Sequence, residues 1–226
     1  TIAAHRCCVV VVGEGLKNLK GEEVAADKSR LDAFGHPVLS GVAEVIEDIV
    51  TEKLKLKRSF DVVFRVYDDG IGFRYEFPDQ PQLKDVVIDD ELTEFDVAPP
   101  ATAWWIPAGE WNRYEYLYNR TPLVEVGQVH TPMTIRTADG LHIAFHEAAL
   151  VDYSSMWLRR VEGQRFRAQL APAAGGWKVR RTAPFHTPWR TLRVAESAAA
   201  LYESKLELNL NEPNALGDVS WFVPAK

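Results

Sequence analysis

The chain has 226 residues, of which 46% are hydrophobic and 11% are aromatic, so it can bury a core and disorder is not expected. Its formal net charge of -6 offers no basic face for phosphates, which argues against a nucleic-acid partner and favours an uncharged or metal-linked small ligand. No apolar run reaches membrane-spanning length and no signal peptide is visible, so we expect no membrane partner. Because the chain opens on Thr1, we expect that a preceding segment was removed.

The first 57 residues are predicted to form an irregular or atypical start. Cys7 and Cys8 are the only cysteines, and adjacent cysteines rarely close a disulfide, so both are expected to be buried thiols in the run CCVVVV. Charge concentrates between residues 20 and 58, where the alternating β pattern is lost. Mixed aliphatic and charged residues predict a helix over residues 41–56.

From about residue 59 onward, short alternating runs predict a β-sandwich or barrel. In FRVYDDGIGFRYEFP, residues 64–78, two such runs flank Asp68, Asp69 and Gly70, which suit a tight hairpin turn. Further strands are predicted at residues 86–88 and 94–97 and in the runs MTIRT, LHIAFHEAAL, MWLRRVEG, FRAQLAP, WKVRRTA, TLRVA and KLELNL. Residues 195–202 are predicted to form a second helix.

An aromatic cluster occupies the stretch AWWIPAGEWNRYEYLYN, residues 103–119. Its members are Trp104, Trp105, Trp111, Tyr114, Tyr116 and Tyr118. Exposed aromatic faces suit the C–H faces of pyranose sugars, and Trp104, Trp105 and Trp111 are candidates for sugar binding. Aromatic residues more often fill a core or a domain interface, and this second interpretation is favoured.

The familiar catalytic and metal-binding motifs are absent from the sequence. There is no phosphate loop, no Gly-x-Ser-x-Gly elbow and no clustered Cys/His set. His130, His142, His146 and His186 fall within the β-rich part, but His142 and His146 lie too far apart on a strand to chelate one ion. These histidines are expected to be surface or hydrogen-bonded residues.

Glu147 lies in the apolar run AFHEAALVDYSSMWL, where Phe145 and Ala149 are expected to form the packing face. A carboxylate at the end of such a strand is either a solvated edge group or a ligand for a hard cation, because burial of an unpaired carboxylate is costly. Composition alone favours the solvated edge.

Several stretches, taken in order, resemble the amino-terminal domain of glycoside hydrolase family 97, a family of exo-acting α-glucosidases and α-galactosidases. They are FRVYDDGIGFRYEFP, ELTEF, HTPMTIRTADGLHIAFHEAALVDYSSMWL, TPWRTLRV and LNLNEPNALGDVSWFVPAK. The resemblance covers roughly residues 58–226 and rests on the ordered set. It implies a mainly β fold, a β-super-sandwich of the galactose mutarotase-like type, in residues 58–226. Residues 1–57 match the family's opening poorly.

The resemblance implies that this sandwich precedes a catalytic (β/α)8 barrel, which this chain lacks. The carboxylates that cleave the glycosidic bond belong to that barrel, so no catalytic residue is assigned here and the chain alone is expected to be inactive. The family also implies export to the periplasm or secretion. It further implies that Glu147, in EA-L, binds Ca²⁺ together with barrel glutamates.

The other residues that match the family are expected to be structural. Trp189 would anchor a core or interface and Arg190 would form an ion pair, at the start of a strand after Pro188. Asn209 and Asn211 would satisfy backbone groups at a strand end, Trp221 would lead toward the barrel, and Ala225 stands where the family usually has glycine.

Three functions remain open from the sequence. The first is the amino-terminal domain of a calcium-dependent, exo-acting glycosidase, with Glu147 as a calcium ligand. The second is a stand-alone carbohydrate-binding module that uses the Trp/Tyr cluster. The third, a mutarotase-like activity, rests on fold analogy alone, and no histidine and glutamate facing one sugar can be assigned to it.

Overall fold

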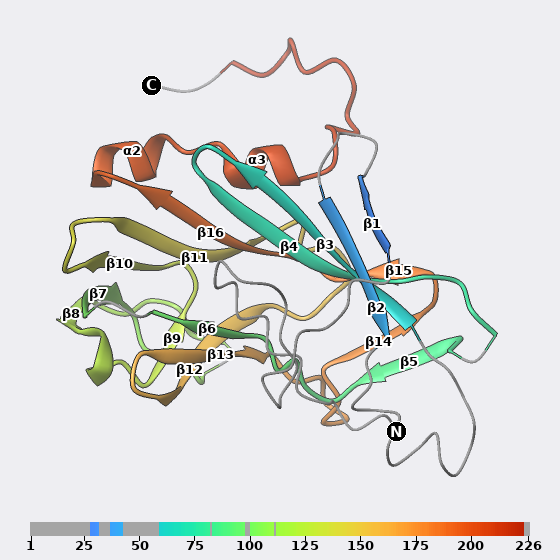
Figure 1. Cartoon of the computed structure of the whole chain (residues 1–226), viewed down its shortest axis with the longest axis horizontal. Coiled ribbons are helices and arrows are strands. Elements are labelled where there is room, and N and C mark those ends of the chain that lie inside the picture. Colours follow the sequence, from blue (N-terminus) through green and yellow to red (C-terminus); the bar gives the residue numbers. More distant parts are fainter. Residues whose placement is uncertain are drawn as a thin grey trace.

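The computed structural model describes residues 28–31, 37–42, 59–81, 83–97, 100–110 and 112–223. In these residues the chain is mainly β-structure, with strands that pair antiparallel in three sheets (Figure 1). The largest sheet has ten strands in the order β1-β2-β3-β4-β16-β11-β10-β7-β8, and β15 pairs with β4. A four-stranded sheet runs β6-β13-β12-β9, and β14 pairs with β5. The mainly β fold predicted from the alternating runs is confirmed.

The strands follow one another in the chain with mostly short connections. Their bounds are β1 Lys28–Leu31, β2 Pro37–Val42, β3 Ser59–Tyr67, β4 Gly70–Phe77, β5 Asp85–Ile88, β6 Glu94–Asp96, β7 Ala101–Trp105, β8 Asn119–Pro122, β9 Gln128–His130, β10 Met133–Thr137, β11 His142–Ala148, β12 Met156–Glu162, β13 Arg165–Leu170, β14 Val179–Thr182, β15 Phe185–His186 and β16 Trp189–Ala195. A 3-10 helix, η3, spans Leu123–Glu125. None of the helices in the described part of the chain is long and apolar enough to span a bilayer.

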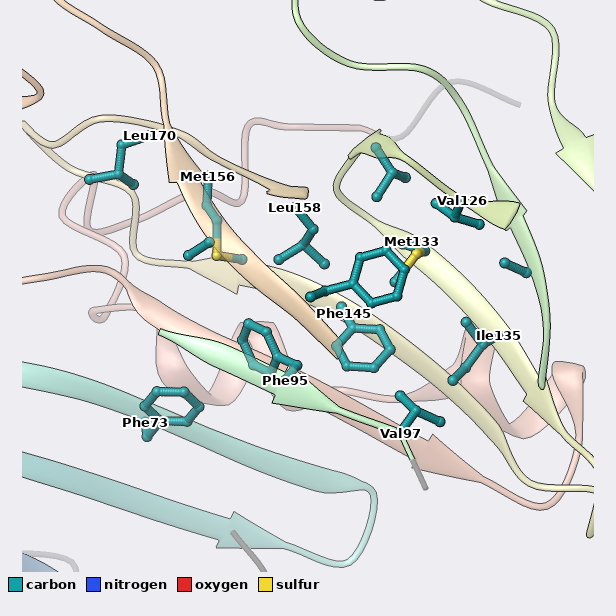
Figure 2. Close-up of a cluster of buried hydrophobic side chains, with 14 of the residues drawn as sticks. Phe73, Phe95, Val97, Val126, Met133, Ile135, Phe145, Met156, Leu158 and Leu170 are labelled. Atoms are coloured by element: carbon teal, nitrogen blue, oxygen red, sulfur yellow. The ribbon is translucent and has the colours of Figure 1, made fainter. Parts of the chain in front are cut away.

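The main hydrophobic core lies between the ten-stranded and four-stranded sheets (Figure 2). Phe145 from β11 packs edge to face against Phe95 from β6, with 5.5 Å between the ring centroids. On β10 the buried side chains Met133, Ile135 and Thr137 alternate with more exposed ones. Because inward side chains recur every second residue in a sandwich strand, this alternation explains why the sequence pattern predicts the sheets correctly.

Two short helices pack against the opposite face of the large sheet (Figure 1). Helix α2 spans Ala198–Glu203, which confirms the helix predicted near residues 195–202. Its first turn is capped by Ser197, whose Oγ accepts a hydrogen bond from the backbone N–H of Ala200 at 3.1 Å. Helix α3 spans Leu206–Leu210, where the sequence predicts a strand, so that prediction is wrong.

Helix α3 is held on the sheet by its own leucines. Leu206 and Leu210 are buried against the sheet, whereas Leu208 between them is 71% exposed. The strand below comes very close, because a Cβ added to Gly72 on β4 would lie 2.4 Å from Cδ1 of Leu210. Trp189 belongs to the same cluster and is completely buried, which confirms its predicted role as a core anchor.

The β3–β4 hairpin turn also contacts these helices. Asp69 Oδ2 accepts hydrogen bonds from Ser204 Oγ at 2.7 Å and from the backbone N–H of Lys205 at 2.9 Å, between α2 and α3. Gly70 follows with a positive φ of 153°. A Cβ at this position would lie 2.2 Å from the backbone oxygen of Leu192. The turn therefore needs glycine for space, and its aspartate ties the hairpin to the helical layer.

The start of the chain differs from the sequence prediction where the structure describes it. Strands β1 and β2 pair with each other, and β2 pairs with β3, so the β pattern is not lost throughout residues 20–58. The helix predicted over residues 41–56 is wrong at Gly41 and Val42, which end β2, and its remaining residues lie outside the described ranges. Cys7, Cys8 and Ala225 also lie outside these ranges.

Candidate functional site

The site is built where β11 and β16 lie side by side. These strands are antiparallel neighbours, and their register places Glu147 directly opposite Arg190. Glu91, from the connection between β5 and β6, reaches the same guanidinium from outside the sheet. The three charged side chains thus come from three separate parts of the chain, and they are defined here as the Glu91–Arg190–Glu147 cluster.

Arg190 is the centre of this cluster and is completely buried. Its Nε lies 2.8 Å from Glu91 Oε1 and its Nη2 lies 2.5 Å from Glu91 Oε2, a bidentate pair. Its Nη1 donates to Glu147 Oε2 at 2.7 Å. Burial alone would lower the pKa of Arg190, but the carboxylates of Glu91 and Glu147 outweigh it and raise the pKa. The ion-pair role predicted for Arg190 is confirmed.

Glu147 is 9% exposed, so the solvated edge favoured by composition is wrong. Residues two apart in a strand face the same side, and Glu147 therefore shares the inward face of Phe145. The backbone N–H of Met156 lies 3.0 Å from Glu147 Oε1 and 3.2 Å from Oε2. Burial raises the pKa of Glu147, while Arg190 acts in the opposite direction.

A polar network supports Glu91 from the other side. Thr93 Oγ1 donates to Glu91 Oε1 at 2.9 Å, and Tyr75 Oη lies 2.8 Å from Thr93 Oγ1. The ring of Tyr153 lies 5.9 Å from the guanidinium carbon of Arg190, and burial strongly raises the pKa of this phenol. Every member is therefore held by at least one neighbour, as a buried polar network requires.

The aromatic cluster is divided between core and surface. Trp105 packs against the main core and its Nε1 donates to Thr121 Oγ1 at 3.2 Å, while the half-buried Trp104 carries the guanidinium of Arg120 at 5.4 Å. Tyr114 and Tyr118 are 51% and 68% exposed, so they do not belong to the core, while a place at a domain interface stays a prediction for them. Trp111 lies outside the described residues.

Tyr114 is fixed in place close to the charged cluster. Its ring lies 4.3 Å from that of His130, and its Oη donates to the backbone oxygen of Thr131. Thr131 Oγ1 donates in turn to the backbone oxygen of Met156 at 3.0 Å, and Met156 N–H binds Glu147. Burial lowers the pKa of His130, so the neutral imidazole is favoured under the tyrosine ring.

Three further histidines, His142, His146 and His186, lie in the described strands. The Nδ1 atoms of His142 and His146 on β11 are buried without a hydrogen-bond partner in the described part of the protein, which differs from the expectation of surface or hydrogen-bonded groups. His186 Nδ1 lies 3.1 Å from the backbone oxygen of Thr187. Among the residues that the structure describes, no group of three or more His, Cys, Asp or Glu side chains is placed to hold a metal ion.

The model of the family described as Glycosyl-hydrolase 97 N-terminal matches residues 18–213. The chain belongs to this family. A retaining alpha-galactosidase of Bacteroides thetaiotaomicron is 23% identical to this glycosyl-hydrolase 97 domain over 205 residues, which cover 76% of the chain and 30% of that protein. The resemblance found in the ordered sequence stretches is thereby confirmed, whereas the proposed division between residues 57 and 58 stays a prediction.

A solved structure gives a second comparison for the glycosyl-hydrolase 97 domain. It is a Glycoside Hydrolase Family 97 enzyme from Pseudoalteromonas sp. strain K8 in complex with acarbose, with 42% identity and a TM-score of 0.72. The match covers 86% of this chain and 30% of that one. The chain thus spans less than a third of the length of these two relatives.

A third match is short and concerns another class of enzyme. A pyrophosphate–fructose 6-phosphate 1-phosphotransferase of Methylococcus capsulatus is 46% identical over 56 residues, which cover 25% of this chain and 13% of the transferase. This match includes too little of the transferase to carry its activity. The glycosyl-hydrolase 97 match, by contrast, extends over all of the described strands.

The donor set at Glu147 fits a shared cation site. An ionised carboxylate accepts about four hydrogen bonds, and Glu147 uses part of this capacity on Arg190 and Met156. With both carboxylates ionised, the Glu91–Arg190–Glu147 cluster has a formal charge of -1 (two acids and one base), which favours a cation. Because Ca²⁺ takes six to eight oxygen ligands, this glycosyl-hydrolase 97 domain would supply only a small part of the coordination shell.

Sequence reasoning missed Glu91. It opens the stretch ELTEF and follows Asp89 and Asp90. Three acidic residues in a row are typical of a solvated loop. A weak signal was available, because Arg190 lies in a β-rich segment where an unpaired guanidinium would be costly to bury. Its partner could not be named from that signal, since the two residues are 99 positions apart in the sequence.

Proposed function

We propose that this domain serves in a calcium-dependent, exo-acting glycoside hydrolase of the α-glucosidase or α-galactosidase type. In this proposal it supports a catalytic barrel elsewhere in the parent protein and lends Glu147 to a calcium ion. The names of the relatives, a retaining alpha-galactosidase and an enzyme solved with acarbose, support this substrate class. Export to the periplasm or secretion is part of the same proposal.

The observation that carries the proposal is the state of Glu147. Its carboxylate is buried and held by Arg190 and Met156, in a cluster with excess negative charge. A bound calcium ion would supply fixed positive charge and coordination positions beside the sugar. The domain's own residues would hold one carboxylate in place and exclude water around it, because Arg190 and Met156 orient Glu147.

The two carboxylates of the cluster are poorly arranged for catalysis by this domain alone. Glycoside hydrolysis uses two carboxyl groups that flank the scissile bond, about 5–10 Å apart, with a sugar between them. Glu91 and Glu147 instead bind one buried guanidinium. We therefore expect no hydrolysis by the isolated chain, and the acid and base belong to the barrel in this proposal.

The test is the calcium response of the parent enzyme with Glu147→Gln. Hydrolysis of aryl α-galactosides and α-glucosides is measured after chelation and again during calcium titration. The proposal predicts that calcium restores wild-type activity and fails to restore the variant at the same concentrations. Glu162→Gln is the control, because Glu162 is an exposed partner of Arg165. An unchanged calcium response in Glu147→Gln would contradict the proposal.

A second candidate function is carbohydrate binding by the exposed tyrosines. Tyr114 and Tyr118 present aromatic faces to solvent, and Tyr114 is anchored by Thr131 and His130. Sugar stacking on such faces would quench the fluorescence of the isolated chain on addition of malto-oligosaccharides or galactosides. Quenching that disappears in Tyr114→Ala would favour this function, and no change in fluorescence would argue against it.

A further inference from the structure

Arg190 pairs with two carboxylates, those of Glu91 and Glu147. Arg190 directs Nε and Nη2 to Glu91, and only Nη1 to Glu147. A guanidinium is planar and its N–H groups lie in a fixed fork, so the bidentate pair with Glu91 sets the plane of the whole group. The direction of Nη1, which donates to Glu147 Oε2, is then set by Glu91.

The charges of the cluster act in the same sense as its geometry. Glu91 offsets the positive charge of Arg190, which is completely buried and has little solvent to screen it. Glu91 thereby keeps the whole cluster negative, which attracts a cation, although its charge also raises the pKa of Glu147. Without the carboxylate of Glu91, Arg190 and Glu147 would form a neutral pair. A cation at Glu147 would then face an unbalanced guanidinium, whose Nη1 lies 2.7 Å from Glu147 Oε2.

Thr93 and Tyr75 extend this support. Thr93 donates to the same oxygen of Glu91 that accepts from Arg190 Nε, and Tyr75 Oη is within hydrogen-bond distance of Thr93. Both side chains are buried. Glu91 therefore has few alternative positions. The same holds for the guanidinium that it orients.

We propose that Glu91 is a positioning residue for the cation site, which acts through Arg190 to orient Glu147 and which offsets the positive charge of Arg190. This inference rests on the proposed role of Glu147 in binding calcium. It assigns a role in cation affinity to a residue whose carboxylate binds Arg190 and Thr93. A purely structural Glu91 would affect stability and leave cation affinity unchanged.

The experiment compares calcium affinity in the full-length parent enzyme, measured by calorimetric titration with CaCl₂ well below the melting temperature. The variants are Glu91→Gln, Glu147→Gln and, as a matched control, Glu94→Gln. Glu94 also pairs with an arginine, at 2.5 Å from Arg167, but it lies on β6 outside the cluster. Loss of an outer support typically weakens metal binding about 10–100-fold, and this is the expected effect of Glu91→Gln. Glu94→Gln should bind like wild type.

Each outcome separates the two proposals. If wild type binds no calcium, or Glu147→Gln binds as tightly as wild type, the proposed function fails and this inference fails with it. If Glu147→Gln loses binding while Glu91→Gln keeps wild-type affinity, only the positioning role is overturned. Should Glu91→Gln not fold, Thr93→Val replaces it, because it keeps all three charges and removes one hydrogen bond to Glu91. A measurable loss of affinity is expected there too, and unchanged affinity would overturn the inference.

Discussion

Glu147 and Arg190 face each other across two neighbouring antiparallel strands, with Glu147 Oε2 2.7 Å from Arg190 Nη1. The pair lies at the end of β11, where the backbone N–H of Met156 also binds the carboxylate. Glu147 thus connects β16 of the large sheet, through Arg190, with the start of β12 in the four-stranded sheet. The same residues that stabilise this junction orient the carboxylate proposed to bind calcium.

Truncation of Arg190 should strongly destabilise the domain. Arg190→Ala leaves Glu91 and Glu147 buried without their cation, and removal of one partner from a buried ion pair costs about 3–5 kcal/mol. Urea unfolding of the chain at neutral pH measures the change. The matched control is Arg181→Ala, since Arg181 pairs with the exposed Asp152. This substitution should lower the free energy of unfolding by about 1 kcal/mol or less. Equal losses in the two variants would contradict the role assigned to the cluster.

The close approach of α3 to β4 predicts a specific rescue. Gly72→Ala should be destabilising, by about 1–3 kcal/mol, because the new methyl group overlaps Leu210 and forces the helix away. Leu210→Ala alone should also be destabilising, since Leu210 is buried. In the double variant the two losses should be clearly less than additive. Thermal unfolding of all four chains tests this, and simple additivity would mean that α3 does not pack as described.

Gly127→Ala provides the control for this cycle. A Cβ at Gly127 would meet no atom within 4 Å, so no clash is expected there. The added side chain restricts the unfolded chain, and the change in the free energy of unfolding should stay within about 1 kcal/mol. A large loss in this variant would show that glycine replacement itself, rather than contact with Leu210, lowers stability.

The core between the sheets should respond to truncation as a close-packed interior. Leu158 is completely buried among side chains of both sheets (Figure 2), so Leu158→Ala should cost about 2–5 kcal/mol. Leu117 is 91% exposed, so Leu117→Ala should lower the free energy of unfolding by less than about 0.5 kcal/mol. Chemical denaturation of both variants checks the difference. Comparable costs would contradict the sandwich core.

His130 should make the domain less stable in mild acid. Burial lowers its pKa below the ordinary value of 6.5, so below that pH the unfolded chain binds more protons than the folded one. The free energy of unfolding therefore falls as the pH drops through this range. His130→Asn removes the proton site, and its stability should decline less steeply between about pH 6.5 and pH 5 than that of wild type. Parallel curves from urea unfolding would contradict this.

The alternating strands could be predicted from sequence because their signal is local. On β10, Met133 and Ile135 point into the core and their neighbours point away, which gives the period-two pattern directly. Helix α3 could not be assigned in this way. Leu206, Leu208 and Leu210 alternate like a strand, yet Leu206 and Leu210 are also spaced i, i+4, and over five residues the two patterns coincide.

The candidate site was only partly predictable for a different reason. Glu147 and Arg190 could each be singled out, but burial of the carboxylate depends on a partner 43 residues away. Glu91 is farther still from Arg190 in the sequence, and its acidic neighbours resemble an ordinary loop. Composition therefore suggested a solvated Glu147, whereas strand register and ion pairing make burial tolerable.

The central claim, that Glu147 is a calcium ligand in the parent enzyme, is tested most directly by a crystal structure of that enzyme grown with CaCl₂. Anomalous scattering from calcium should show an ion with a Glu147 oxygen about 2.3–2.6 Å away. Arg190 should remain paired with Glu91. The account would be contradicted by a calcium ion bound elsewhere, or by its absence, while Glu147 contacts only Arg190 and Met156.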